Sequence, residues 1–260
     1  MPIEFVGGNS PVLLTIPYAG TVMHKRIVDR LVDDTQCATA PDRHLGRLLN
    51  GLHGDLNLLS PKFHRYLSDV DCVIPAPQLG TAKTMVGVVP LLCPKGKSIW
   101  RRPPDIREAT RWRAIWYAPY HAVLAAQIAC IRAKFGHVVV INCRARAQNT
   151  SQGDNLNTAD ITVSSITRSP YSANFTAGLM SILKTNNKIS FHMDGPTSTG
   201  WLPRQNGPPK TSVQALVLEF NELCYLTEDE HSGLFNTALA KNLQDALQQV
   251  MAYAVDWRPH

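Results

Sequence analysis

The chain has 260 residues, of which 44% are hydrophobic and 18% are charged, and its formal net charge is +6. This composition excludes an intrinsically disordered chain, and the length suits one α/β domain, so we expect a single domain over residues 1–260. The N-terminus lacks the pattern of a signal peptide, and no apolar run of membrane-spanning length stands out. The six cysteines lie far apart without a CxxC pair, which is typical of reduced thiols in a cytoplasmic protein.

The first half of the chain alternates predicted strands and helices. An apolar strand over 11–17 is followed by a helix near 40–50 and by a short strand near 63–67. The stretch 74–104 is rich in proline, glycine and lysine and lacks periodicity. We therefore expect a long surface excursion there, near the functional site.

A long helix is predicted to begin at Pro103-Pro104-Asp105 and to end at Gly136. Pro119 lies inside it and predicts a kink, because proline removes a helical hydrogen bond. Apolar residues repeat at helical spacing, which predicts the face that packs on the core: Ile115, Ala118, Ala122, Ala125 and Ile128.

The second half contains two strands whose residues are apolar on both faces, 138–141 and 213–219. Helices near 171–185 and 234–254 are expected to cover the sheet. We therefore predict an α/β fold with three αβα layers around a mixed, largely parallel central sheet.

Polar side chains follow these buried strands. Tyr18 follows the first strand in a Pro/Gly turn, Asn142 and Arg144 follow the second, and Glu219 ends the third. In open α/β sheets, ligands bind beyond the carboxyl ends of the strands. We therefore expect these four residues to share one cleft.

The motifs along the chain resemble those of the N-formylglutamate amidohydrolase family. The matching segments are Leu13–Gly20, Arg65–Cys72, Gly87–Pro90, Ile106–Gly136, Val138–Arg144, Ala159–Ser165, Gly200–Gly207 and Val213–Glu219. Five of them depart from the family pattern at residues that matter for chemistry. Family histidines are replaced in several segments by Tyr18, Arg144, Gln205 and Gln214, and the family's Asn-Arg pair is replaced by Asp71 and Cys72.

The resemblance implies a zinc-peptidase-like architecture and hydrolysis of the formyl amide of N-formyl-L-glutamate to formate and glutamate, a step of histidine degradation. It also implies a divalent metal, such as zinc, that activates water and polarises the carbonyl. Glu219 and His121 are the implied catalytic residues. Residues that would bind the small dicarboxylate substrate are Arg65, Arg204, Arg144 and Tyr18.

Each of these residues also has an ordinary structural interpretation. Glu219 can be a strand-end glutamate paired with a neighbouring cation, and Arg65 and Arg204 can be surface arginines. His121 can be a hydrogen-bonded histidine on a buried helix face.

The replaced histidines define what we expect of the metal. Neutral imidazole is a preferred zinc ligand, whereas the guanidinium of Arg144 repels a dication. We therefore assign no metal ligand, and expect this chain to bind zinc poorly and to hydrolyse its substrate weakly. The alternative is a catalytically inactive relative that binds a small dicarboxylate or a protein partner.

The basic residues over 95–113 permit three interpretations. They can form a nucleic-acid-binding surface, the solvated start of the long helix, or a positively charged entrance to the site that attracts a dianionic substrate. The chain has no recognisable nucleic-acid-binding motif. We favour the solvated helix start, and expect neither a nucleic-acid nor a membrane partner.

Overall fold

The computed structural model describes residues 2–32, 42, 44–52, 55–72, 85–93, 97–146, 159–165, 170–194, 212–227 and 233–259. The strands are β1 (Ile3–Val6), β2 (Val12–Thr15), β3 (Asn57–Pro61), β4 (Met85–Val86), β5 (Val89–Pro90), β6 (Val138–Arg146), β7 (Ile161–Ser165), β8 (Phe191–Asp194) and β9 (Val213–Asn221). The helices are α1 (Lys25–Val28), α3 (Leu45–Leu49), α4 (Ile106–Trp112), α5 (Ala118–Phe135), α6 (Pro170–Thr185) and α8 (Thr237–Asp256).

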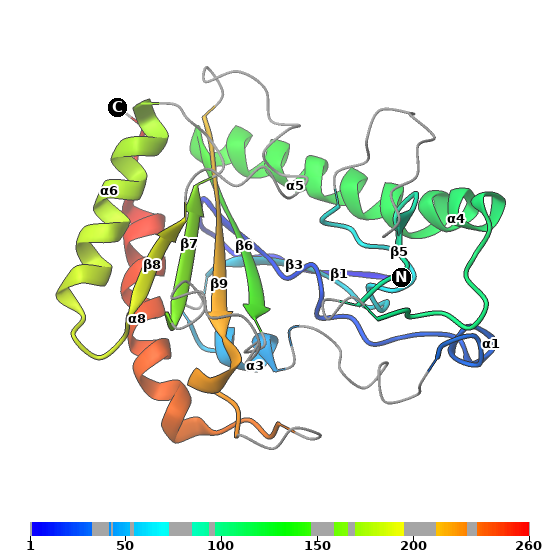
Figure 1. Cartoon of the computed structure of the whole chain (residues 1–260). Coiled ribbons are helices and arrows are strands. Elements are labelled where there is room, and N and C mark those ends of the chain that lie inside the picture. The colour runs from blue at the N-terminus through cyan, green and yellow to red at the C-terminus, as the bar shows by residue number, and fades with distance from the viewer. Residues whose placement is uncertain are drawn as a thin grey trace.

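One seven-stranded sheet organises the molecule, with strand order β1-β3-β2-β6-β9-β7-β8 (Figure 1). The central strands β2, β6 and β9 are parallel to one another, whereas β1 pairs with β3, and β7 with β9, in antiparallel orientation. The prediction of a mixed, largely parallel sheet is confirmed. The strands predicted over 11–17, 138–141 and 213–219 lie side by side at its centre.

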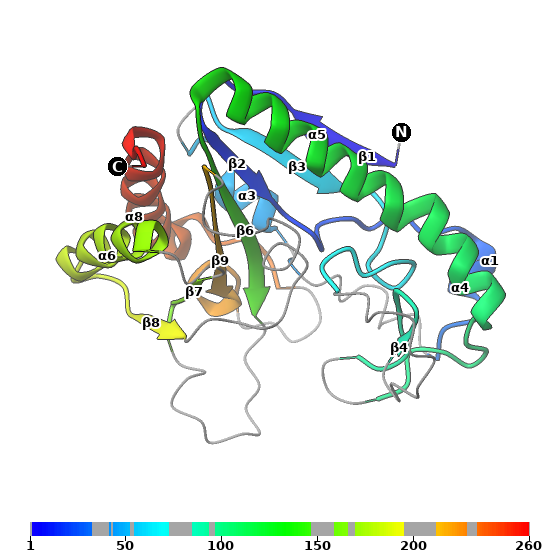
Figure 2. The same cartoon turned by 90° about the horizontal axis from the view of Figure 1, so that it is seen from above.

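Helices cover both faces of this sheet. Figure 2 shows α4 and α5 along one face and α6 and α8 along the other. Val138 and Val140 of β6 pack on the side of α5, whereas Val139 and Ile141 pack in the cluster that includes α3, α6 and α8. This alternation explains why β6 is apolar at every position, because each face meets a separate hydrophobic layer. The predicted αβα arrangement is confirmed.

Strand β6 is longer than predicted. It runs to Arg146, so Asn142, Cys143 and Arg144 lie within the strand rather than beyond it. Side chains alternate across a strand, so Cys143 enters the core with α8, while Asn142 faces the pocket side with α5. This alternation puts Asn142 and Arg144 on one face.

The long helix begins where the sequence predicted. Asp105 and Glu108 form a reciprocal capping box at its start, and Gly136 ends it with a left-handed backbone (φ 79°). A π-helical turn over Arg113–Tyr117 directly precedes Ala118 and Pro119. This wider turn accommodates the proline, which cannot donate the usual helical hydrogen bond.

The predicted packing face of this helix is wrong for four of its five residues. Ile115 is 46% exposed, and the three alanines are exposed as well; only Ile128 is buried. Besides Ile128, the core receives larger side chains from another stripe of the helix, which are Tyr117, Tyr120, Leu124 and Ile131. By length and composition alone the helix Ile106–Phe135 is apolar enough to span a membrane, but here this stripe packs on the sheet.

Two further predictions are corrected. The strand predicted near 63–67 lies at Asn57–Pro61, because the alternation of buried residues falls there, whereas 63–67 forms turns and one bridge from Phe63 to Val22. The described parts of 74–104 are not only a surface excursion. Strands β4 and β5 form a two-stranded sheet, and Val88, Val89, Ile99 and Trp100 are buried.

Gly20 is required by a close approach next to the site. A Cβ atom at Gly20 would lie 2.1 Å from the carbonyl oxygen of Phe63. We predict that Gly20→Ala lowers the free energy of unfolding by about 1–3 kcal/mol, because backbone on both sides must move. Gly46→Ala in α3 is the matched control, since no described residue outside the helix lies within 4 Å of its Cβ position. Thermal unfolding of both variants measures the difference; equal stabilities would contradict this packing.

Candidate functional site

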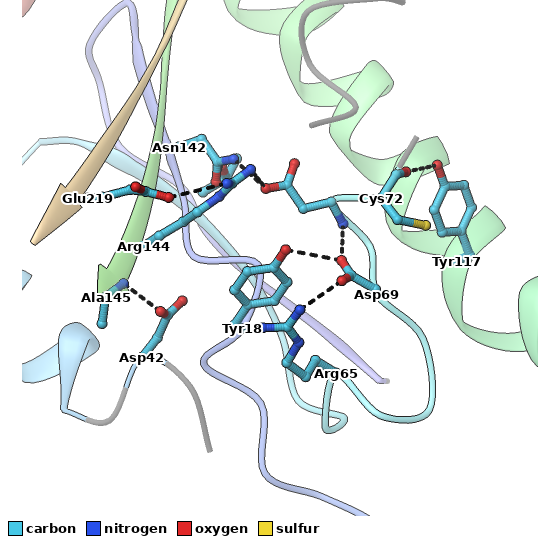
Figure 3. Close-up of polar contacts among 12 residues, drawn as sticks. Tyr18, Asp42, Arg65, Asp69, Cys72, Tyr117, Asn142, Arg144, Ala145 and Glu219 are labelled. Atoms are coloured by element: carbon cyan, nitrogen blue, oxygen red, sulfur yellow. Dashed lines mark hydrogen bonds and ion pairs between the residues drawn. The ribbon is translucent and has the colours of Figure 1, made fainter. Parts of the chain in front are cut away.

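The carboxyl ends of β2, β6 and β9 bring together charged and polar side chains (Figure 3). Tyr18 follows β2, Arg144 lies in β6 and Glu219 lies in β9, where the register pairs Arg144 with Glu219. The turns after β3 add Arg65, Asp69 and Asp71. The prediction that Tyr18, Asn142, Arg144 and Glu219 share one region is confirmed by the contacts below.

Arg144 is the centre of this cluster. Its Nη2 is ion-paired with Asp71, and its Nη1 lies 3.4 Å from Oε1 of Glu219. The Arg144 side chain is 13% exposed. Burial alone would lower its pKa, but the carboxylate charges of Asp71, Glu219 and Asp69 outweigh burial and raise the pKa above its ordinary value. Arg144 is therefore a permanent cation held by two carboxylates.

Asp71 is fixed to the sheet by a short chain of hydrogen bonds. Asn142 Nδ2 donates to Asp71 Oδ2 at 2.9 Å, and Thr15 Oγ1 donates to Asn142 Oδ1 at 3.0 Å. Thr15 and Asn142 are register partners in β2 and β6. The buried carboxylate thus has both a counter-ion and an amide donor, which a buried charge requires.

Asp69 organises the other side of the cluster. Its carboxylate accepts hydrogen bonds from Tyr18 Oη at 3.1 Å, Arg65 Nη2 at 2.9 Å and the backbone N–H of Asp71 at 3.0 Å. The guanidinium of Arg65 stacks on the Tyr18 ring, 4.0 Å from its centroid. Burial, with the charges of Asp69 and Asp71, raises the pKa of Tyr18 well above its ordinary value, so Tyr18 is a neutral phenol. The charge of Arg65 is already balanced by Asp69.

His121 lies on the buried face of α5. Burial lowers its pKa to about 4, so its imidazole is neutral near pH 7. It lines a small pocket together with Asp71, Asn142 and Tyr120, about 10 Å³ in volume, which has room for about one water molecule. His121 therefore lines the same small pocket as Asp71, the ion-pair partner of Arg144. Its catalytic role remains a prediction.

Of the sequence-derived positions that the structure describes, Gln214 is not part of this cluster. Gln214 pairs with Val139 near the start of β9, five register steps from the Arg144–Glu219 pair, so it lies away from the carboxyl edge. Arg204 and Gln205 lie outside the described residues.

Sequence reasoning missed Asp42. Its Oδ1 accepts a hydrogen bond of 2.5 Å from the backbone N–H of Ala145, and Figure 3 shows this contact beside Arg144. The residue has a left-handed backbone (φ 64°) and is 3% exposed. Burial raises its pKa to about 7, against the opposing effects of the Ala145 hydrogen bond, Arg65 and Arg144. No periodicity marks this residue, since only the fold brings it to β6 from 103 residues away in the sequence.

The described residues do not fit a divalent metal. In the part of the chain that the structure describes, no group of three histidine, cysteine, aspartate or glutamate side chains is arranged to hold one. The two carboxylates nearest the centre, Asp71 and Glu219, are directed at the guanidinium of Arg144 instead. A dication in this position would meet a buried positive charge.

A mixed αβα sheet with ionisable side chains gathered at the carboxyl ends of its central strands defines an α/β protein whose polar cluster lies where such folds bind their ligands. The chain belongs to the N-formylglutamate amidohydrolase family, whose family model matches residues 10–226.

The chain is also similar to individual relatives and to solved structures over nearly its whole length. N-formylglutamate deformylase of Pseudomonas aeruginosa is 22% identical and is aligned over 98% of this chain and 96% of its own length. The deformylase of Pseudomonas putida is 20% identical over the same shares. The crystal structure of N-formylglutamate amidohydrolase from Ralstonia eutropha superimposes with a TM-score of 0.78 at 19% identity, covering 97% of this chain and 98% of its own. A gene product of Agrobacterium tumefaciens gives 0.71 at 14% identity, covering 97% and 94%.

The Arg144–Asp71 pair makes a direct stability prediction. Arg144→Met and Asp71→Asn should each lower the free energy of unfolding by about 3 kcal/mol, because each change removes the more buried ion-pair partner of the remaining charge. The double variant should lose less than the sum of the two by about 1 kcal/mol or more.

The exposed pair Lys241–Asp245, with N···O 3.4 Å, supplies the control cycle. Its coupling should stay below about 0.5 kcal/mol, because solvent screens it. Chemical denaturation of the four variants in each cycle measures both couplings, and a coupling near zero for Arg144 and Asp71 would show that they do not depend on each other.

Proposed function

We propose that this chain hydrolyses the formyl amide of N-formyl-L-glutamate, releasing formate and glutamate. The reaction would take place at the cluster around Arg144, which consists of Tyr18, Asp42, Arg65, Asp69, Asp71, Asn142, Arg144 and Glu219. The family match over residues 10–226 carries the proposal, and the two aligned deformylases support it. The substrate would be a small dicarboxylate met in the cytoplasm, as a step of histidine degradation.

The cluster offers groups suited to this chemistry without a metal. Arg144 is a fixed cation whose N–H groups can stabilise the oxyanion that forms when water adds to the formyl carbon. Glu219 is the more exposed of its two carboxylate partners, at 31% against 4% for Asp71. A guanidinium does not acidify water as a bound metal does, so we infer that turnover is weak.

Substrate carboxylates require cationic partners. We assign this role to Arg65 and Arg204, with Tyr18 packing beside Arg65. Since Arg65 is already paired with Asp69 at 2.9 Å, a substrate carboxylate must share or displace that partner. This competition also predicts modest affinity.

Because the charged groups of the cluster already pair with one another, the site equally favours a second candidate. This candidate is a catalytically inactive relative that binds a small dicarboxylate or a protein partner. It would retain the fold and the charged edge without turnover. The basic segment gives no comparable support for nucleic-acid binding, because Arg101 donates to the Val32 carbonyl and so fastens two segments together.

Formate release and metal content together test the proposal. The unmodified protein should release formate from N-formyl-L-glutamate slowly, and elemental analysis should find well under one zinc per chain. N-acetyl-L-glutamate serves as the substrate control for the formyl group. Binding of N-formylglutamate without any formate release would favour the second candidate, and stoichiometric zinc with brisk release would overturn our account of the site.

Restoring the family's histidines should change the metal content. The double variant Tyr18→His, Arg144→His should bind more zinc than the unmodified protein, because it removes the guanidinium and adds two imidazoles. A triple variant that also carries Asp71→Asn is the control, because replacing Arg144 leaves the Asp71 carboxylate without its ion-pair partner. Metal content is measured by elemental analysis after dialysis against zinc. Zinc binding that stays at the level of the unmodified protein would show that these two positions do not govern it.

A further inference from the structure

Three buried polar atoms of the cluster have no hydrogen-bond partner among the described residues. They are one acceptor, Asp42 Oδ2, and two donors, Arg65 Nε and Arg144 Nε. A buried polar atom without a partner is costly, and in a native structure it calls for an explanation such as a ligand. That three such atoms belong to one cluster indicates a place prepared for a polar group.

The three side chains are electrostatically linked. The guanidinium groups of Arg65 and Arg144 both act on the charge of Asp42. Asp42 is also tied to the strand that carries Arg144, because it accepts from the N–H of the next residue, Ala145, with its other oxygen. The bond to Ala145 uses Oδ1 and leaves Oδ2 as the free acceptor.

This set of atoms matches a formamide and an attacking water. The carbonyl oxygen of a formyl amide accepts from a guanidinium N–H, and a water molecule donates to a carboxylate oxygen. Glu219 is less suited to receive that proton, since its Oε1 lies 3.4 Å from Arg144 Nη1 in an ion pair.

We propose that Asp42, rather than Glu219, is the general base of this site. Oδ2 of Asp42 takes a proton from water as the water oxygen bonds to the formyl carbon, and the carbonyl electron pair moves to oxygen, where the Arg144 Nε–H stabilises it. The C–N bond then breaks, the carbonyl reforms, and the proton passes from Asp42 to the leaving nitrogen. The products are formate and the free amine. This inference rests on the proposed function.

The environment of Asp42 suits this role. Burial raises its pKa to about 7, so both protonation states are populated near neutral pH, as a base that later acts as an acid requires. The charged groups that act on it are Arg65 after β3 and Arg144 in β6, which favour the carboxylate, and Glu222 after β9, which opposes it. Among the described residues, the thiol of Cys143 is a further titratable neighbour, and its pKa is raised by burial and by Asp42 itself.

Asp42→Asn tests the proposal with little change in shape. The amide oxygen can still accept from Ala145, but the amide nitrogen cannot take a proton. We expect kcat for formate release to fall about 100-fold or more, while KM changes little. The rise of kcat/KM toward pH 7 should disappear. Asp160→Asn is the matched control, because Asp160 accepts from Ser190 outside the cluster, and it should leave kcat unchanged.

A measurement that does not depend on turnover completes the test. In protein labelled with ¹³C at aspartate carboxyl groups, one NMR signal should titrate near pH 7 and be absent from Asp42→Asn. An Asp42 signal that titrates in the ordinary acidic range would overturn the inference. Formate release that is equal in Asp42→Asn and the unmodified protein would overturn it while the proposed function stood. Absence of formate release from the unmodified protein would overturn the proposed function, and this inference with it.

Discussion

A buried guanidinium must be balanced, and the balance of Arg144 determines the rest of the site. Its ion pairs with Asp71 and Glu219 connect the turns after β3 to two central strands of the sheet. Asp71 is held in turn by Asn142, and its backbone N–H by Asp69, which also binds Tyr18 and Arg65. Because each charge in this network is the partner of another, a change at one position alters what its neighbours can bind.

The same balance sets the chemistry that is available. A metal ion offers open coordination positions and acidifies a bound water, whereas a guanidinium offers only directed N–H donors. With Arg144 at the centre, the site retains a way to stabilise negative charge but depends on a carboxylate to take the proton of water. Oδ2 of Asp42, which has no hydrogen-bond partner among the described residues, is therefore more significant here than it would be beside a metal.

The sequence predicted the sheet centre well and the charge network poorly. The strands containing Val138–Ile141 and Val213–Glu219 were predictable because strands buried on both faces are apolar at every position. The packing face of the long helix was not, because a stripe of alanines and a stripe of larger residues share the same period, and burial selects the larger. Tyr18, Arg144 and Glu219 could be placed at one edge from strand order alone. Asp42 and Asp69 could not, since their contacts arise between segments that only the folded chain brings together.

Arg144 lies between Asp71 and Glu219, which neutralise its charge and are therefore not free to hold a metal ion. Anomalous diffraction at the zinc absorption edge, from crystals equilibrated with zinc, tests this claim most directly. The account predicts no anomalous peak among these three side chains, with Arg144 still between the two carboxylates. A peak bound by Asp71 or Glu219, with the guanidinium displaced, would contradict it.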